Sequence, residues 1–479
     1  MSRQHVSREQ VLRGPLVRTL LILAWPTVTT AALQGIVTAL DGVMVARLGE
    51  TAVAAVASAR QVFQVILGLG AAIGASTSIL VAQAIGRGDY AAARHIATQA
   101  LISFSLLMSA LLLPLGWYGA PPVMRGLAPD DHDVVAAGIP YLRVLVLSLA
   151  PSVMTFGALG ALRGAGDVRT PLRLTFWTNI ITVILTYALI FGLPGTLVRG
   201  WGLIGAAWGS LGGRLVILVM LYAMLASGKL VLRLEHPRRW MPDWPLLRQM
   251  AWLGGPQALS AILLNLWGLL AIRVLYMTPE ARAAVAAYSL SMLLRNLGVW
   301  VTWGLGEATL AMVGQNWGGR RLSRARRVGW QSARVALLYL VPVSVAMALF
   351  GPWLMGAMLV DTPEREAAVL LIGTRFLWSQ VLAMPLLGAG MAFEGALRGT
   401  GDTTTPLWIN ILSLYVCGLP LAWVLAPTMG ADGVWLGMAV GHGVRGGLGA
   451  WFWARAVRSW SRTQWTERLA GPPAAEANR

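Results

Sequence analysis

Two stretches of sequence decide the fold: ALRGAGDVRTPL at residues 161–172 and ALRGTGDTTTPL at residues 396–407. They are near-copies set 235 positions apart, which is close to half of the 479 residues. Other pairs recur at a similar spacing. LVAQAIGRGDYAAAR at 80–94 returns as MVGQNWGGRRLSRAR at 312–326, GLIGAAWG at 202–209 returns as GADGVWLG at 430–437, and Pro26 pairs with Pro256. The chain is therefore an internal duplication.

The composition excludes a water-soluble globule. Hydrophobic residues make up 56% of the chain and charged residues only 12%, with a mean hydropathy of +0.64. A soluble domain carries roughly 25% charged residues. Since a membrane helix needs about 20 apolar residues, the pattern predicts twelve membrane segments, at 15–45, 53–85, 95–119, 135–160, 171–193, 203–228, 248–277, 284–315, 328–354, 367–395, 405–426 and 433–456.

Each half holds six predicted segments, and six is even, so both halves enter the membrane from the same side. Parallel repeats of this kind are typical of transporters, although gene duplication also produces structural membrane proteins. We expect an all-α protein of two pseudo-symmetric six-helix lobes. Residues 1–228 form the N-terminal lobe, 229–248 a cytoplasmic linker, 249–456 the C-terminal lobe and 457–479 a cytoplasmic tail.

The charge of +18 is unevenly distributed. The N-terminus and every second connection hold 26 of the 38 basic residues, whereas the opposite loops are mostly acidic. The positive-inside rule then places both termini in the cytoplasm. The excess charge reports topology, so nucleic acid is excluded as a partner. Cys417 is the only cysteine, which excludes a disulfide scaffold.

An ionisable side chain inside a membrane span is costly and usually functional. Asp41 is the strongest candidate: with Thr27, Thr30, Gln34 and Thr38 it forms one polar stripe at helical spacing. A second stripe in the fifth segment centres on Asn179. If the two stripes face each other, Asp41 and Asn179 form the core of a proton or sodium site, because an isolated carboxylate in an apolar setting can carry a proton. The alternative is a structural Asp41 bonded to neighbouring hydroxyls.

The C-terminal half offers weaker candidates. Asn296, Trp300, Trp303 and Glu307 lie on one helix face and would suit an amphipathic cation, but Trp also gathers at membrane interfaces. Glu394 precedes Arg398 by four residues, so we expect an ion pair within one helix. His442 and Arg445 are expected to form a packed polar pair, with a proton relay through His442 as the alternative.

Several classes of site are missing from the sequence. The two RG-x-GD-x-x-TP loops lack the Lys and Ser/Thr of a phosphate-binding loop. We expect Gly to make their turn and Pro to open the next helix. ATP is therefore excluded as a direct energy source. The scattered histidines form no metal constellation, and no catalytic grouping emerges, so neither a metal, a cofactor nor an enzymatic activity is expected.

The chain resembles the multidrug and toxic compound extrusion (MATE) family. The matching pieces include AWP at 24–26, Asp41, ARLGETAVAAVA at 46–57, GEATLAMVGQNWGG at 306–319 and the repeated loops, and they span nearly the whole chain. The resemblance implies twelve helices in two lobes, alternating access, and export of cationic or amphipathic compounds in exchange for H⁺ or Na⁺. Related flippases share the superfamily fold.

The family's DinF-like branch matches Asp41 and Asn179, and Gln34 and Tyr141 fit its N-lobe pocket. That branch usually has a second Asp where this chain has Val183, which favours a single proton over a coordinated Na⁺. NorM-like members carry an acid early in the seventh helix, where this chain has Asn265, so that mechanism does not transfer. Tyr141 and Asn265 are counted with Asn296, Trp300, Trp303 and Glu307 as substrate-binding candidates.

We therefore expect a monomeric antiporter in a bacterial cytoplasmic membrane that exports small organic cations or amphipathic compounds and is surrounded by lipid. The alternative is a flippase for a lipid-linked oligosaccharide, which needs arginines converging on a pyrophosphate. Six arginines lie within or near the predicted spans: Arg60, Arg143, Arg214, Arg273, Arg295 and Arg375.

Overall fold

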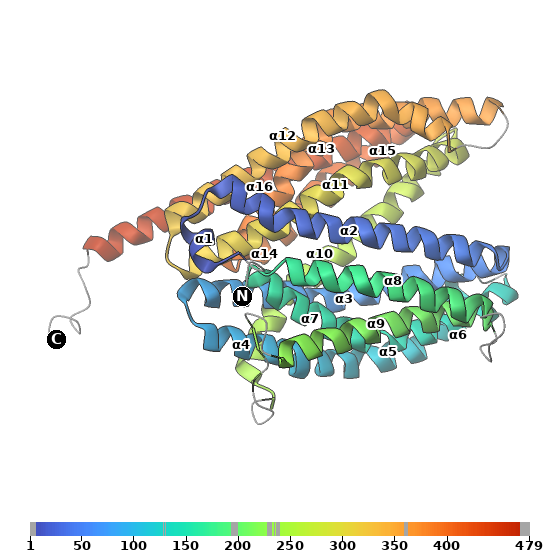
Figure 1. Cartoon of the computed structure of the whole chain (residues 1–479). Helices are drawn as coiled ribbons and strands as arrows, with labels where there is room; N and C mark the ends of the chain where they lie inside the picture. The colour runs from blue at the N-terminus through green and yellow to red at the C-terminus, as the bar shows by residue number, and fades with distance from the viewer. Residues whose placement is uncertain are drawn as a thin grey trace. The chain divides into compact units, whose positions relative to one another are not determined.

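The computed structural model describes residues 6–127, 129, 131–192, 200–227, 232–233, 235, 240–358 and 363–469, with backbone only at 363–365 and 461–469. The elements in this part of the chain are all helices (Figure 1). The N-terminal half contains α1 (Arg8–Arg13), α2 (Leu16–Ala46), α3 (Glu50–Arg87), α4 (Tyr90–Gln99), the π-helix η1 (Ala100–Phe104), α5 (Ser105–Leu127), α6 (His132–Leu147), α7 (Leu149–Gly164), α8 (Arg169–Phe191) and α9 (Gly202–Ala226).

The C-terminal half begins with α10 (Trp244–Leu275). It continues with α11 (Ala281–Gly318), α12 (Leu322–Gly356), α13 (Pro363–Thr400), α14 (Thr404–Asn410), the π-helix η3 (Ile411–Gly418), α15 (Leu419–Met429) and α16 (Ala431–Leu469). Eleven helices or helix pairs in the described chain are long and apolar enough to cross a membrane. The twelfth predicted segment, 433–456, lies inside the 39-residue α16, so every predicted segment coincides with a long helical rod.

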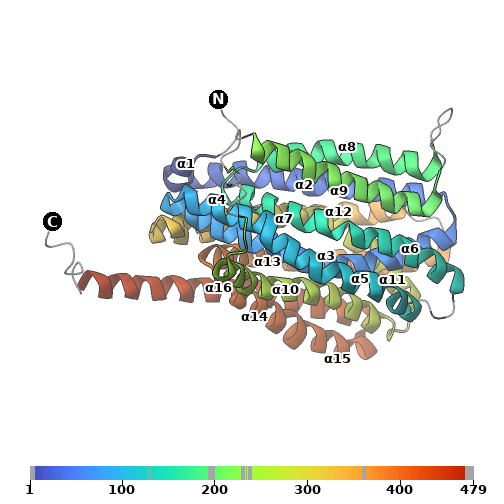
Figure 2. The same cartoon turned by 90° about the horizontal axis from the view of Figure 1, so that it is seen from below.

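By its internal contacts the described chain separates into two compact units. Unit 1 comprises residues 1–14 and 21–265, and unit 2 comprises residues 15–20 and 266–479. The boundary falls inside α10, later in the chain than the linker 229–248 that the sequence predicts. In unit 1, α3 packs against α6 and α7, and α8 runs beside α9 (Figures 1 and 2). In unit 2, α13 packs against α11, α12 and α16.

Close glycine contacts hold the equivalent helix pair of each unit together. A Cβ on Gly160 of α7 would lie 2.1 Å from the carbonyl oxygen of Gly74 on α3. A Cβ on Gly395 of α13 would lie 2.3 Å from the carbonyl oxygen of Gly306 on α11. The spacings between the equivalent glycines are 232 and 235 residues, the same offsets as in the sequence repeat. The duplication thus preserves a backbone-to-backbone contact that only glycine permits.

The repeated RG-x-GD-x-x-TP loops are structural, as predicted. Gly166 and Gly401 adopt φ of +85° and +96°, a region that favours glycine. The Asp167 carboxylate accepts hydrogen bonds from the Thr170 backbone N–H at 3.0 Å and from the Thr170 hydroxyl at 2.7 Å. Asp402 accepts the equivalent pair from Thr405 at 2.9 and 2.6 Å. Each loop therefore satisfies one of the backbone N–H groups that the first turn of the next helix leaves free.

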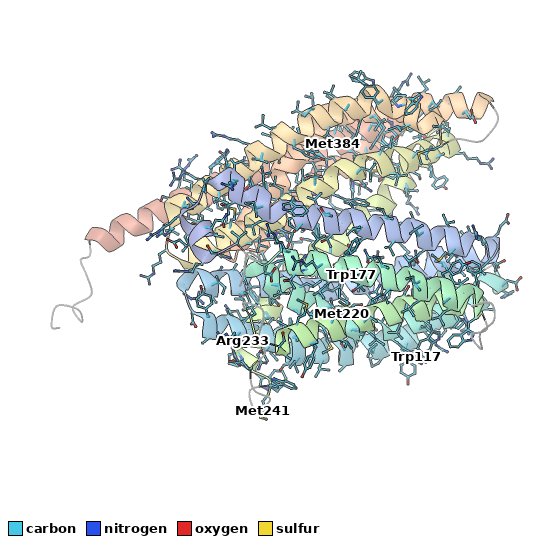
Figure 3. The ribbon with its side chains drawn as sticks, in the orientation of Figure 1. Trp117, Trp177, Met220, Arg233, Met241 and Met384 are labelled. Carbon is cyan, nitrogen blue, oxygen red and sulfur yellow. The ribbon has the colours of Figure 1, made fainter. Side chains whose placement is uncertain are left out.

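The segment that leads into α10 is docked on unit 1. His95 of α4 bonds Glu235 at 2.8 Å and Asp243 at 2.9 Å through its two ring nitrogens. The His95 bond to Asp243, together with the hydrogen bond from the Leu246 N–H, lowers the pKa of Asp243 below its usual 3.8. Gln99 donates to the Met241 carbonyl at 2.8 Å, and Met241 is labelled in Figure 3. The described part of the predicted linker is thus fixed to α4.

Candidate ion-coupling and substrate-binding sites

The polar stripe of α2 does not lie in a single environment. Thr27 and Asp41 are buried, whereas Gln34 and Thr38 are exposed at the protein surface. The Thr38 hydroxyl donates to the Gln34 backbone carbonyl at 2.9 Å, a bond within its own helix. The stripe therefore contributes one buried carboxylate, whereas its Gln34 and Thr38 side chains are exposed.

Asp41 is buried but not isolated, which corrects the prediction from sequence. Arg60 of α3 donates to Asp41 Oδ2 at 3.1 Å. The other carboxylate oxygen, Oδ1, is buried and has no hydrogen-bond partner. Sequence reasoning missed the pair because Asp41 and Arg60 lie on different helices. One oxygen of Asp41 is neutralised and the other remains free to bind a proton or a donor.

A second arginine and a tyrosine complete this centre in unit 1. Tyr141 of α6 is fully buried and interacts electrostatically with Arg60. Arg214 of α9 interacts electrostatically with Asp41 and with Tyr141. Its guanidinium also donates to the Ser152 hydroxyl. Asp41 is therefore one anion beside two cations, and Tyr141, which was expected in the N-lobe pocket, lies with them.

Arg214 is held in addition by an aromatic ring. Its guanidinium carbon lies 4.9 Å from the ring centroid of Phe63 on α3, a cation–π distance. This contact joins α9 to α3.

Asn179 does not complete the Asp41 site in the manner predicted. Its Nδ2 amide is buried without a hydrogen-bond partner. Asp41 Oδ1 is also unpartnered, so these two groups make no bond to each other. The Thr178 and Thr186 hydroxyls of the same helix are buried without partners as well. α8 therefore presents several unsatisfied polar groups within unit 1, and its role in ion coupling stays a prediction.

A three-arginine site of the kind a pyrophosphate needs is not formed around Asp41. Arg60 and Arg214 share this centre, but Arg143 lies 5.3 Å over the ring of Trp117 on α5, which Figure 3 labels. In unit 2, Arg375 pairs with Asp432 at 2.9 Å and Arg295 bonds His442 at 2.9 Å.

In unit 2, the expected ion pair between Glu394 and Arg398 is wrong. The Glu394 carboxylate instead accepts two hydrogen bonds from Arg445 of α16, from Nε at 2.6 Å and from NH2 at 2.9 Å. Both side chains are buried, with 9% and 8% of their surface exposed. Arg398 donates to the backbone carbonyl of Glu394, at 3.4 Å. A bidentate geometry across helices outcompetes the pairing along one helix.

Glu307 is the acid that Arg398 neutralises, at 3.4 Å. Glu307 is 9% exposed, whereas Trp303, one turn earlier on α11, is 44% exposed. Trp300 and Asn296 are half-buried. The predicted aromatic and acidic face is thus divided between a buried ion pair and an exposed indole. Asn265 is exposed and donates to the Ala261 carbonyl of its own helix at 2.8 Å.

His442 does not pair with its neighbour Arg445 but with Arg295 of α11. Arg295 NH1 lies 2.9 Å from His442 Nε2. An arginine can only donate, so Nε2 accepts and Nδ1 carries the ring hydrogen of the neutral imidazole. Both His442 Nδ1 and Arg295 Nε are buried without partners. The predicted pair of His442 with Arg445 is therefore wrong, and the observed pair joins two helices.

Sequence reasoning named Arg60, Arg214 and Arg295 only for the flippase alternative, and Arg445 only as a partner of His442. All four lie inside apolar segments, and this position is the signal that marks them for the sites. Among the described residues, no group of three or more His, Cys, Asp or Glu gathers in a way that could hold a metal ion.

Comparisons with known proteins agree with this architecture. The model of the MatE family matches residues 26–188 and 256–424, once in each half. A probable multidrug resistance protein NorM of Bradyrhizobium diazoefficiens is 31% identical over 89% of this chain and 90% of its own length. One from Deinococcus radiodurans is 29% identical over 89% and 92%.

Solved structures show the same fold. An outward-facing multidrug resistance MATE family transporter of the MOP superfamily aligns with a TM-score of 0.86 at 21% identity, over 96% of this chain and 99% of that one. A MOP superfamily transporter from Pyrococcus furiosus, described as having a binding pocket of reverse polarity, gives the same TM-score and identity over the same shares.

The duplicated helical units with buried charges define a multi-pass integral membrane transporter rather than an enzyme. With family matches over more than half of its length, the chain belongs to the MATE family.

Proposed function

We propose that this transporter is a secondary antiporter that exports cationic or amphipathic compounds, drugs and toxins among them, in exchange for protons. The observation that carries the proposal is Asp41, a buried carboxylate in a membrane helix with one oxygen bonded to Arg60 and one oxygen free. The names of the relatives, probable multidrug resistance proteins, support the substrate class.

The charges around Asp41 supply a coupling mechanism. With Asp41 ionised, the centre formed with Arg60 and Arg214 carries a net charge of +1. A proton on Asp41 raises it to +2. A cationic substrate nearby is then repelled more strongly, by about 4 kcal/mol for one further unit charge at roughly 4 Å and an effective dielectric constant of 20. Proton entry would thus expel the substrate, which is what exchange requires.

The same charges favour H⁺ over Na⁺. A sodium ion needs several oxygen ligands and is repelled by adjacent guanidinium groups, whereas a proton needs a single oxygen. Asp41 Oδ1 provides that oxygen, and Val183 stands where the DinF-like branch usually has a second acid. We place the protein functionally with that branch because its candidate coupling acid lies in the N-terminal half.

We further propose that the protein works as a monomer in a bacterial cytoplasmic membrane, with both termini in the cytoplasm and with alternating access between its two halves. The distribution of basic residues between alternate connections supports this orientation. The flippase alternative gains no support at Asp41, because Arg143 contacts Trp117 instead of joining Arg60 and Arg214.

The proposal is tested by ethidium transport in liposomes containing the purified protein. An imposed pH gradient should drive transport, an imposed Na⁺ gradient should not, and Asp41→Asn should abolish the response to the pH gradient. Asp432→Asn is the matched control, since Asp432 pairs with Arg375 in an exposed position. Coupled transport at the normal rate by Asp41→Asn would refute the role of Asp41. Transport under neither gradient by folded protein would refute the antiport.

A further inference from the structure

The most unusual buried group in unit 2 is the guanidinium of Arg295. It is 8% exposed, its bonded partner is the imidazole of His442, and its electrostatic neighbours are Tyr288 and the like-charged Arg445. Arg445 has its own acid, Glu394, which it engages with two hydrogen bonds. The centre therefore holds two cations and one anion, and that anion is committed to Arg445.

The internal duplication shows how such a charge is handled elsewhere in the chain. Phe63 and Arg295 differ by 232 positions, the offset of the α3 and α11 repeat, and Arg214 and His442 differ by 228, the offset of GLIGAAWG and GADGVWLG. The contact between Arg295 and His442 is thus the counterpart of the contact between Arg214 and Phe63. Both units therefore carry an arginine at the equivalent contact between two helices. In unit 1 this arginine lies on α9, and in unit 2 it lies on α11.

The two units differ in the acid near this contact. Asp41, fifteen residues after Pro26, interacts with Arg214 in unit 1. The residue fifteen positions after Pro256 is Ala271, which is buried and has no charge. Unit 2 therefore has an uncharged residue at the position that is equivalent to Asp41 in unit 1. An unneutralised guanidinium inside a protein is strongly destabilising unless an anion accompanies it.

We propose that Arg295 and His442 form a binding site for a small anionic group, of the size of a chloride ion or a single carboxylate. Arg295 Nε and His442 Nδ1 are both N–H donors, both buried and both without partners. Buried N–H donors without partners and one excess positive charge are the chemistry that holds such an anion. The inference concerns binding and does not depend on the export function proposed above.

The site is tested by the thermal stability of the purified protein, followed by tryptophan fluorescence, in sodium isethionate, whose anion has no carboxylate, with increasing chloride at constant ionic strength. We expect a saturable rise in melting temperature of roughly 2–4 °C. Parallel titrations with acetate and benzoate distinguish the two sources of the anion. A response to chloride alone indicates an inorganic anion, and a response to acetate or benzoate indicates a carboxylate such as an amphipathic substrate would supply.

Variants make the test specific. Arg295→Gln should lose the saturable response and should melt no lower than wild type in isethionate, because it removes an unneutralised buried charge. His442→Gln should weaken the response. Arg375→Gln is the control, since Arg375 already has Asp432 as its partner, and it should respond normally. No saturable response in wild type with any of the three anions, or an equal response in Arg295→Gln, would overturn the proposal.

Discussion

Replacing Gly395 by alanine should force α13 away from α11 and destabilise unit 2. The added Cβ would lie 2.3 Å from the carbonyl oxygen of Gly306, with the Gly306 carbonyl carbon at 3.0 Å and its Cα at 3.2 Å. These are backbone atoms, which cannot move aside independently. Ordinary contact begins near 3.4 Å, so the helices must separate by about 1 Å at this level.

The net cost follows from two opposing effects. Overpacking of this kind costs about 1–3 kcal/mol, whereas alanine gains up to about 1 kcal/mol over glycine as a helix former. The separation would also strain the neighbouring ion pairs, because Gly306 precedes Glu307 and Gly395 follows Glu394. We therefore expect a net loss of about 1–2 kcal/mol.

The assay is the melting temperature of purified protein in detergent, compared between Gly395→Ala and Gly447→Ala. Gly447 lies on α16 with nothing within 4 Å of its would-be Cβ, so its alanine variant should melt at or above the wild-type temperature. Gly160→Ala should reproduce the loss in unit 1, where the contact with the Gly74 oxygen is 2.1 Å. Equal melting of Gly395→Ala and Gly447→Ala would refute the reasoning.

Two further predictions concern charged groups. Glu394→Gln leaves the buried Arg445 without an anion and should lower the free energy of unfolding by about 3–5 kcal/mol. A second substitution, Arg445→Gln, should restore much of this stability. A double variant as unstable as the single one would contradict the prediction. The pKa of Asp243 is lowered below 3.8 by its hydrogen bonds, so its contact with His95 stabilises the docked linker above that pH and is lost as the pH falls through the lowered value. Hydrogen exchange at residues 240–243 should rise on acidification into that range, and Asp243→Asn should remove the acid-dependent step; an unchanged pH profile in this variant would refute the contact's role.

The sequence by itself determined the membrane architecture. Twelve apolar segments and the repeat of ALRGAGDVRTPL as ALRGTGDTTTPL predicted twelve helical rods in two related halves, because helix length and hydropathy are local properties that the bilayer enforces. The roles of the repeated loops were also readable, since Gly166 and Asp167 act within a few residues of the chain. Asp41 could be singled out because a carboxylate in an apolar segment is rare.

Only the tertiary structure decided the partners. Asp41 pairs with Arg60 across two helices, Glu394 pairs with Arg445 rather than with Arg398, and His442 bonds Arg295. Sequence spacing favours pairs one turn apart on a helix, but in a membrane protein the buried faces of different helices set which charges meet. The strength of a buried ion pair depends on that three-dimensional geometry and on the second hydrogen bond it permits, which is why the sequence named the charged residues while the packing of the helices assigned them to one another.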